Sequence, residues 1–137
     1  MNREIAVGLI NTPEGLLTLY RNDQGHFELP GGKIRDNERP EDTVVRELKE
    51  ELGVVVTTLG RVAMPLGITK RNGDRATVHL VPARIEQGIP HSREALHGEV
   101  RRMGPFGLRY HRDDMSPALS QVAKLIIDGD LQLEEAS

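Results

Sequence analysis

The chain has 137 residues, of which 37% are hydrophobic and 28% charged, so its length and composition predict a single globular domain over residues 1–137. A formal net charge of -3 at pH 7 gives no electrostatic reason to bind nucleic acid or a membrane surface, and we expect neither partner. The sequence has no cysteine, which excludes disulfides and thiolate metal sites, and no apolar run of signal-peptide or membrane-spanning length, so we expect a cytoplasmic protein.

Short aliphatic and β-branched runs bounded by turn residues predict most of the strands. The first two runs, residues 4–10 and 16–20, flank the turn cluster NTPEG and are expected to pair as a hairpin. The segment FELPGGKI at 27–34 predicts a brief strand broken by a proline and two glycines, where the backbone is strained or closely approached. Further strands are expected at 54–64, 75–85 and 99–104, the second interrupted by Pro82. Turn-rich loops are expected at 65–74 and 86–93.

Two segments have the features of helices. Residues 41–52 are the best candidate, because Pro40 suits a first turn and Gly53 is a plausible C-cap. A Ser-Pro pair at 116–117 predicts the start of a second helix, which would close at Gly129. Strands on both sides of a helix, with another helix at the end, indicate an α/β or α+β fold with a mixed sheet.

The first helix candidate carries two stripes on its surface. The apolar stripe consists of Val44, Val45, Leu48 and Leu52. Glu47, Glu50 and Glu51 form a second stripe that borders the first. A helix docked through its apolar stripe would hold these carboxylates at the edge of the interior, lining a groove. The alternative is a solvated face in which Arg46 and Glu50 form an ordinary ion pair one turn apart.

A longer pattern surrounds these glutamates. Residues 32–54 read GKIRDNERPEDTVVRELKEELGV, which fits G-x5-E-x7-R-E-U-x-E-E-x-G-U at every specified position, with U an aliphatic residue. The chain therefore resembles the Nudix hydrolases, whose box has this pattern. The lead-in FELPGGK and the final helix also resemble the family, although Phe27 stands where tryptophan is commoner. The segment EVRRM resembles a family strand in which Arg102 replaces the usual aromatic residue.

The resemblance implies a fold and an activity. The fold would be a Nudix-like α/β/α sandwich with a mixed β-sheet, in which the box forms a loop, a helix and a loop. The activity would be metal-dependent hydrolysis of a nucleoside diphosphate linked to another moiety, and in the MutT-like branch cleavage of a nucleoside triphosphate to monophosphate and pyrophosphate. Alternatives are a hydrolase of ADP-ribose, nucleotide sugars or dinucleoside polyphosphates, and a nucleotide-binding regulatory module. The oligomeric state is left open, a homodimer included.

The glutamate stripe suits a divalent cation. Carboxylates spaced three and four residues apart share a helix face, and Mg²⁺ or Mn²⁺ takes oxygen ligands, so a bound ion converts the repulsion among them into coordination. The ion would then bridge to a nucleotide or another diphosphate-containing small molecule. By resemblance, the metal ligands are the Gly32 carbonyl and the carboxylates of Glu50 and Glu51, and Glu47 is either a further ligand or the base.

Further roles follow from the resemblance. Arg46 would orient the glutamates, and Glu38 would assist them from farther away. The base that activates water is either Glu47 or a glutamate from a later loop, which supplies the base in some relatives. The segment EALHGEV resembles that loop and makes Glu94 the second candidate. The alternative for Glu94 is an exposed loop residue without such a role.

Contacts with substrate are less sharply indicated. Arg21 and Lys33 adjoin the predicted site and are candidates for contacts with phosphate groups, although isolated surface cations are more common. His97 is a weaker candidate for contact with substrate. The chain has no tryptophan, so stacking of a nucleobase would depend on Phe106, Tyr110 or arginine side chains.

Overall fold

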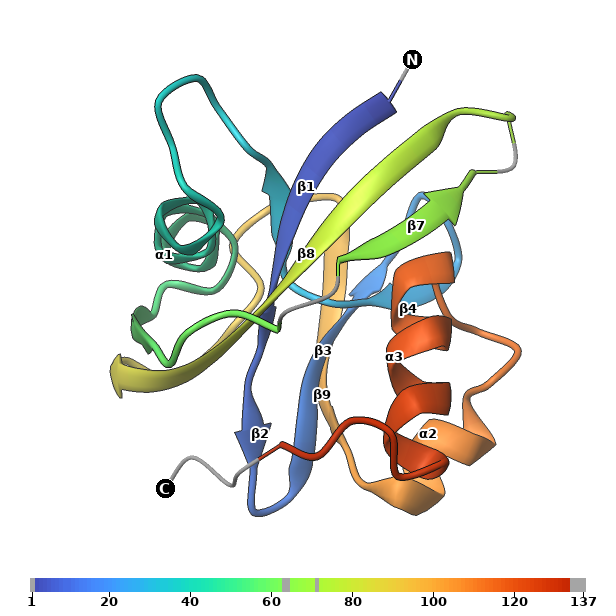
Figure 1. The fold of residues 1–137 in the computed structure, drawn as a ribbon. Coiled ribbons are helices and arrows are strands. Elements are labelled where there is room, and N and C mark those ends of the chain that lie inside the picture. Colours follow the sequence, from blue (N-terminus) through green and yellow to red (C-terminus); the bar gives the residue numbers. More distant parts are fainter. Residues whose placement is uncertain (1, 63–64, 71, 134–137) are drawn as a thin grey trace.

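The structure is a computed structural model that describes residues 2–62, 65–70 and 72–133. Its β-sheets lie between helices, with α1 (Pro40–Leu52) on one side and α2 (Pro105–Tyr110) and α3 (Pro117–Ile127) on the other (Figure 1). The predicted α/β/α sandwich with a mixed sheet is confirmed. Within the described part of the chain, every helix is too short or too polar to cross a membrane.

Within the described residues, the strands form two sheets. The larger one has the order β5-β1-β8-β6, with β7 also paired to β8, and β1 and β8 run parallel. Its members are β1 (Asn2–Leu9), β5 (Gly31–Lys33), β6 (Val55–Thr58), β7 (Leu66–Thr69) and β8 (Arg75–Gln87). The smaller sheet is antiparallel, with β3 paired to β2, β4 and β9. Its members are β2 (Asn11–Thr12), β3 (Gly15–Arg21), β4 (His26–Glu28) and β9 (His97–Met103).

The core consists of two apolar clusters on opposite sides of the sheets. One cluster packs α1 against the strands and includes Ala6 and Val81, and the other packs α3 and includes Val7 and Leu80. Successive residues of a strand point to opposite faces, so β1 and β8 are buried on both faces. This double burial is typical of parallel strands covered by helices on both sides.

The predicted hairpin between residues 4–10 and 16–20 is confirmed only next to its turn, where the N–H of Leu17 donates to the carbonyl of Ile10 at 2.9 Å, and it is wrong for the rest of the first run. Strand β1 pairs with β8 and β5, and the tight hairpin joins β2 to β3, where Asn11 lies opposite Leu16. The reason is the burial of β1 on both faces, which places it inside the larger sheet with a partner on each edge.

The predicted loop at 65–74 is wrong in its first part, which contains strand β7, whereas its second part is a turn. Leu66 and Ile68 point to the same face of β7, and Ile68 is buried. The turn into β8 is closed by the N–H of Lys70, which donates to the carbonyl of Asp74 at 2.8 Å. Turn-forming residues on both sides hid this short alternation of apolar residues.

Two other strand predictions change in extent. The strand expected at 54–64 shortens to β6, and residues 63–64 lie outside the described part of the chain. Strand β8 is continuous through Pro82. Its pairing with β1 ends at this proline, opposite Leu9, so the missing N–H removes no later bond of that ladder.

The predicted helix at 41–52 is confirmed as α1. Its C-cap, Gly53, has a left-handed φ of 69° and donates its N–H to the carbonyl of Lys49 at 3.1 Å. The fully buried apolar residues of α1 are Val44, Leu48 and Leu52. Val45 is 39% exposed, so its assignment to the apolar stripe is wrong, whereas Glu51 is only 4% exposed. One glutamate of the predicted stripe therefore faces the interior.

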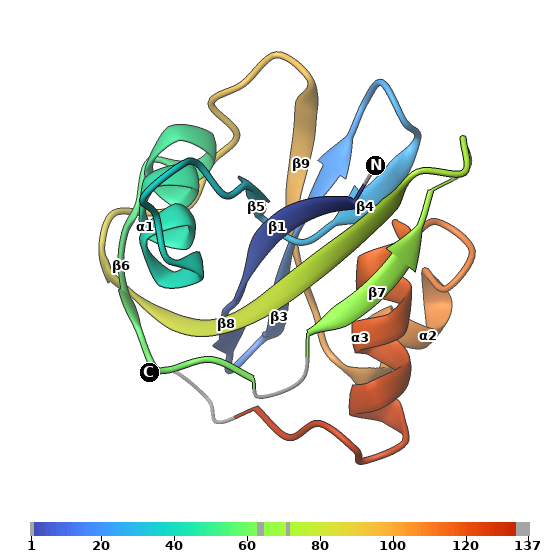
Figure 2. The ribbon, with the colours of Figure 1, turned by 45° about the horizontal axis from the view of Figure 1, so that its top comes forward.

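The segment after β8 brings β9 to the end of α1 (Figure 2). The N–H of His91 donates to the carbonyl of Leu52 at 3.2 Å, and the N–H of Arg93 donates to the carbonyl of Glu51 at 3.0 Å. These bonds satisfy carbonyls that the end of a helix leaves free. Strand β9 therefore starts beside Glu51. The C-terminal helix is confirmed as α3, whereas the short helix α2 was not predicted.

Candidate active site

Glu51 is the buried carboxylate of the site. Its Oε1 accepts a hydrogen bond from the N–H of Gly31 at 2.8 Å. Burial raises the pKa of Glu51 to about 9 against the opposite effect of this bond, and the negative charges of neighbouring glutamates raise it further. A positive charge beside Glu51 would relieve this cost, so the position suits a bound cation.

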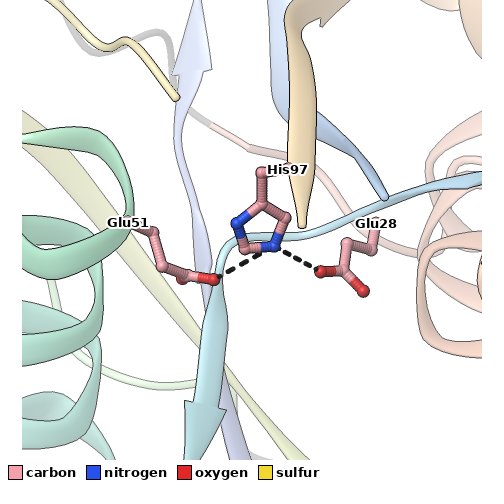
Figure 3. Close-up of side chains that lie close together, drawn as sticks. All are labelled: Glu28, Glu51 and His97. Carbon is pink, nitrogen blue, oxygen red and sulfur yellow. Dashed lines mark hydrogen bonds and ion pairs between the residues drawn. The ribbon is translucent and has the colours of Figure 1, made fainter. Parts of the chain in front are cut away.

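Three elements bring ligand-type side chains together around Glu51 (Figure 3). His97 begins β9, Glu28 ends β4 and Glu51 lies in the last turn of α1. The His97 Nε2 atom lies 3.1 Å from Glu28 Oε1 and 3.5 Å from Glu51 Oε2. One ligand atom from each residue lies within 4.8 Å of the other two. The group is compact enough for a single ion.

Arg46 contacts the carboxylates of Glu38, Glu47 and Glu50. Its Nε donates to Glu38 Oε2 at 2.8 Å and its Nη1 donates to Glu47 Oε1 at 2.8 Å. Its Nη2 donates to the carbonyl of Lys33 at 3.1 Å, and Glu50 Oε2 lies 3.7 Å from Nη1. The hydrogen bonds from Arg46 lower the pKa of Glu38 to about 2, with further bonds from the Arg35 N–H and the Thr43 hydroxyl. One guanidinium thus links the box glutamates to strand β5.

The two glycines before the box allow a close approach of strand and helix. Gly31 has a φ of 153°, and a Cβ there would lie 2.1 Å from the carbonyl oxygen of Ala6. A Cβ on Gly32 would lie 2.5 Å from Glu47 Oε1. The backbone of Gly32 therefore adjoins the Glu47 carboxylate, where the sequence predicted a shared metal site.

The three glutamates of the predicted stripe differ in exposure. Glu51 is buried, Glu47 is half-buried and Glu50 is exposed. Burial raises the pKa of Glu47, although its bond to Arg46 opposes the shift. Glu94 is exposed, and its Oε1 lies 3.6 Å from His97 Nδ1. The stripe thus runs from the interior to the surface, and Glu94 adjoins its buried end.

The candidates for phosphate contact lie at different edges of the site. Arg21 pairs with Asp23 at 2.7 Å and lies 3.5 Å from Glu28, so its charge already faces two carboxylates. Lys33 is exposed, and its carbonyl rather than its ammonium contacts Arg46. The structure brings Arg21 beside the group of Glu28, Glu51 and His97, and Lys33 beside Arg46.

The exposed aromatic residues lie elsewhere. Phe106 and Tyr110 stack on one another with ring centroids 6.0 Å apart, and they are 79% and 71% exposed. They line a pocket of about 240 Å³ together with Arg101 and Arg102. This pocket adjoins the end of β9 opposite to His97, so the structure does not join these aromatics to the carboxylates.

Sequence reasoning missed Glu28 and underestimated His97. Glu28 lies between the buried residues Phe27 and Leu29, so alternation along the strand turns its side chain to the other face. That alternation was a usable signal, because a charged residue inside a buried strand needs a partner. The placement of His97 had no local signal, since its partners Glu28 and Glu51 are distant in the sequence.

The donors fit a divalent cation. Carboxylate oxygens are ligands for Mg²⁺ and Mn²⁺, and an imidazole nitrogen is a ligand for first-row transition metals. Within the described residues, the buried His97 Nδ1 has no hydrogen-bond partner, and Glu51 is a carboxylate buried among others. The residues that would hold an ion are therefore present, with Glu47 and Glu50 beside them.

Comparisons with known proteins agree with this description. A NUDIX domain model matches residues 2–117. The 8-oxo-dGTP diphosphatase of Proteus vulgaris is 58% identical over 33 residues, which cover 24% of this chain and 30% of the relative. The 8-oxo-dGTP diphosphatase of Escherichia coli K12 is 45% identical over 56 residues, which cover 37% of this chain and 43% of the relative. The chain thus spans less than half the length of either relative.

A solved structure provides an independent comparison of the fold. The NUDIX hydrolase from Nitrosomonas europaea matches with a TM-score of 0.81, covering 100% of both chains at 15% sequence identity. At this identity the likeness concerns the fold alone.

Proposed function

The chain belongs to the NUDIX family, and from this premise we propose that it is a divalent-metal-dependent hydrolase of a nucleoside diphosphate linked to another moiety. The proposal depends mainly on the convergence of Glu51 with Glu28 and His97. Beside them, Arg46 donates hydrogen bonds to Glu47 of the glutamate stripe and to Glu38. The preferred substrate class is a nucleoside triphosphate, cleaved to monophosphate and pyrophosphate. This choice rests on the named activity of the two curated relatives.

Different residues of the box would bind the metal ion and position its ligands. A bound Mg²⁺ or Mn²⁺ supplies positive charge for the diphosphate and lowers the pKa of a water molecule. Glu50, Glu51 and the Gly32 carbonyl would hold the ion, with Glu47 as either a further ligand or the base. Arg46 donates a hydrogen bond of 2.8 Å to Glu47 and would keep the glutamate stripe in place when substrate binds. Glu38 takes part indirectly, because it binds the other edge of the same guanidinium.

Two residues are candidates for the base that accepts a proton from water. Glu47 is half-buried and its pKa is raised, which brings a carboxylate closer to the range of an effective base. Glu94 is exposed at the border of the site. The variant Glu94→Gln separates the two assignments. At saturating metal, a loss of turnover by orders of magnitude would place the base at Glu94, and a small change would leave it at Glu47.

Contacts with phosphate groups are proposed for Arg21 and Lys33. Arg21 lies beside Glu28 and would turn from Asp23 toward a bound phosphate. Lys33 has an exposed side chain next to the carbonyl that Arg46 binds. Both are long cations on strands that border the carboxylates, so they would offset the charge of a polyphosphate.

The proposal is tested by a hydrolysis screen on metal-free protein. Canonical and oxidised nucleoside triphosphates are compared with ADP-ribose, nucleotide sugars and dinucleoside polyphosphates, each with Mg²⁺, with Mn²⁺ and with chelator. The expected result is metal-dependent release of monophosphate and pyrophosphate from a triphosphate, identified by mass. Preference for another diphosphate would overturn the substrate class. Nucleotide binding without any product would overturn the enzymatic function and favour a regulatory module.

A further inference from the structure

We propose that the imidazole of His97 is a nitrogen ligand of the bound ion, with Glu28 and Glu51 as oxygen ligands, so that this site selects Mn²⁺ over Mg²⁺. The inference deepens the proposed function and rests on it, because it names the ion that the same site prefers. It adds Glu28 and His97, which lie outside the box, to the ligands.

The separations of His97 Nε2 from the two carboxylates are close to those of neighbouring ligands. In octahedral coordination with bonds of about 2.1 Å, adjacent ligand atoms lie about 3 Å apart. The His97 Nε2 atom is 3.1 Å from Glu28 Oε1 and 3.5 Å from Glu51 Oε2 (Figure 3). An ion between these atoms would require only small movements of the side chains. The ligands also come from separate elements, β4, α1 and β9, which hold them from three sides.

The second nitrogen of His97 supports the same assignment. The His97 side chain is 5% exposed, and its Nδ1 is buried without a hydrogen bond to any described residue. Glu94 Oε1 lies 3.6 Å from this atom, which is too long for a hydrogen bond. A histidine that binds a metal through one nitrogen commonly donates the other N–H to a carboxylate. Glu94 is exposed and free to close this gap, which would complete a carboxylate–histidine–metal arrangement.

A purely structural ion pair explains the cluster less well. As a cation, His97 would neutralise Glu28, but Arg21 Nη1 already lies 3.5 Å from the same Glu28 oxygen. A metal ligated by Nε2 gives both nitrogens a role and brings positive charge to Glu51.

The nitrogen ligand determines the selectivity. Mg²⁺ takes oxygen ligands and retains several waters, so a nitrogen ligand disfavours it. Mn²⁺ also favours oxygen ligands, but as a transition metal it accepts an imidazole in the same site. Loss of a residue that orients a metal ligand commonly lowers affinity by about 10- to 100-fold, and loss of the ligand itself should cost at least as much. The variant His97→Gln should therefore weaken Mn²⁺ binding by about 10- to 100-fold or more and change Mg²⁺ binding little.

The test uses the full, metal-free chain without a histidine tag. Mn²⁺ and Mg²⁺ are titrated by calorimetry, and the Mn²⁺-loaded protein is examined by pulsed electron paramagnetic resonance for coupling to ¹⁴N. The control variant is His79→Gln, which removes another half-buried histidine, one that lies 3.5 Å from Glu4. We expect ¹⁴N coupling and tighter Mn²⁺ binding in the wild type and in His79→Gln, and loss of both in His97→Gln.

Mn²⁺ bound without ¹⁴N coupling in the wild type would overturn the inference, and this outcome does not depend on whether His97→Gln folds. Unchanged Mn²⁺ affinity in a folded His97→Gln would overturn it as well. Hydrolysis is measured on the same samples. Coupling without turnover supports the His97 ligand and contradicts the proposed enzyme, whereas turnover without coupling supports the enzyme and overturns the ligand.

Discussion

Gly31 and Gly32 are neighbours that are required for different reasons. At Gly31, the backbone excludes a side chain: φ is 153°, and a Cβ would lie 2.1 Å from the carbonyl oxygen of Ala6. At Gly32, the nearest atom to a Cβ is the end of a flexible side chain, Glu47 Oε1, at 2.5 Å. The first glycine therefore serves the fold, and the second serves the position of a carboxylate.

Substitution with alanine should separate these roles. Gly32→Ala should leave the unfolding temperature nearly unchanged, but lower turnover by about 100-fold, because the displaced Glu47 carboxylate no longer lies where the site needs it. Gly31→Ala should lower the free energy of unfolding by about 1–3 kcal/mol or more, through a strained φ and a backbone clash. Thermal unfolding and steady-state kinetics check both. A stable Gly31→Ala or a fully active Gly32→Ala would contradict the assignments.

The sequence predicts the part of the site that lies on a single helix, α1. The convergence of Glu47, Glu50 and Glu51 follows from helix periodicity, which is a local property. The burial of Glu51 depends on how α1 docks, and the contacts with Glu28 and His97 depend on which strands meet its end. Alternation along its strand was a signal that Glu28 needs a partner, but the choice of Glu51 and His97 as partners is long-range and leaves no periodic signal in the chain.

At the scale of elements, local signals sufficed for helices and failed for strand partners. The caps of α1 and α3 are readable from Pro40, Gly53 and the Ser-Pro pair at 116–117. Strand β1 was expected in a hairpin, but its partners were decided by the burial of both its faces between α1 and α3. Strand β7 was hidden among turn residues and is stabilised by pairing with β8. Partner choice in sheets is a tertiary property.

The N-cap of α3 provides a test at this scale. The buried Ser116 hydroxyl accepts the N–H of Leu119 at 3.2 Å. Ser116→Ala should lower the free energy of unfolding by about 1 kcal/mol, because that N–H loses its partner, while turnover stays unchanged. Ser120→Ala, on the exposed face of the same helix, is the control and should be close to neutral. Urea unfolding of the three proteins compares the values, and equal stability of both variants would exclude the cap.

At the scale of the whole molecule, metal binding should be linked to stability and pH. The pKa of Glu51 is raised from 4.5 to about 9 in the metal-free protein. A raised pKa in the folded state contributes stability that is complete below the unfolded value of 4.5 and is lost as the pH rises toward 9. A bound cation favours the ionised carboxylate and removes this loss. Metal should therefore raise the unfolding temperature more at alkaline than at acidic pH.

Thermal unfolding with Mg²⁺ and with chelator, between about pH 6 and about pH 8.5, measures this difference. In the wild type, the rise in unfolding temperature caused by the metal should become larger as the pH increases. In Glu51→Gln, which cannot ionise, the growth should be much smaller. An increment that is constant or falls with pH would show that Glu51 is not the linked group.

The central claim is that the glutamate stripe of α1 binds the metal ion required for hydrolysis, and the variant Glu50→Gln tests this claim most directly. Glu50 is exposed, so the substitution removes a charged ligand without a cavity or a buried unpaired group. The control is Glu86→Gln, an exposed carboxylate that pairs with Arg84 on β8. The measurement is turnover of the preferred triphosphate with Mg²⁺ and with chelator. We predict metal-dependent turnover in the wild type and in Glu86→Gln, and a loss of orders of magnitude in a folded Glu50→Gln. Near-normal turnover in Glu50→Gln, or wild-type turnover that survives the chelator, would contradict the claim.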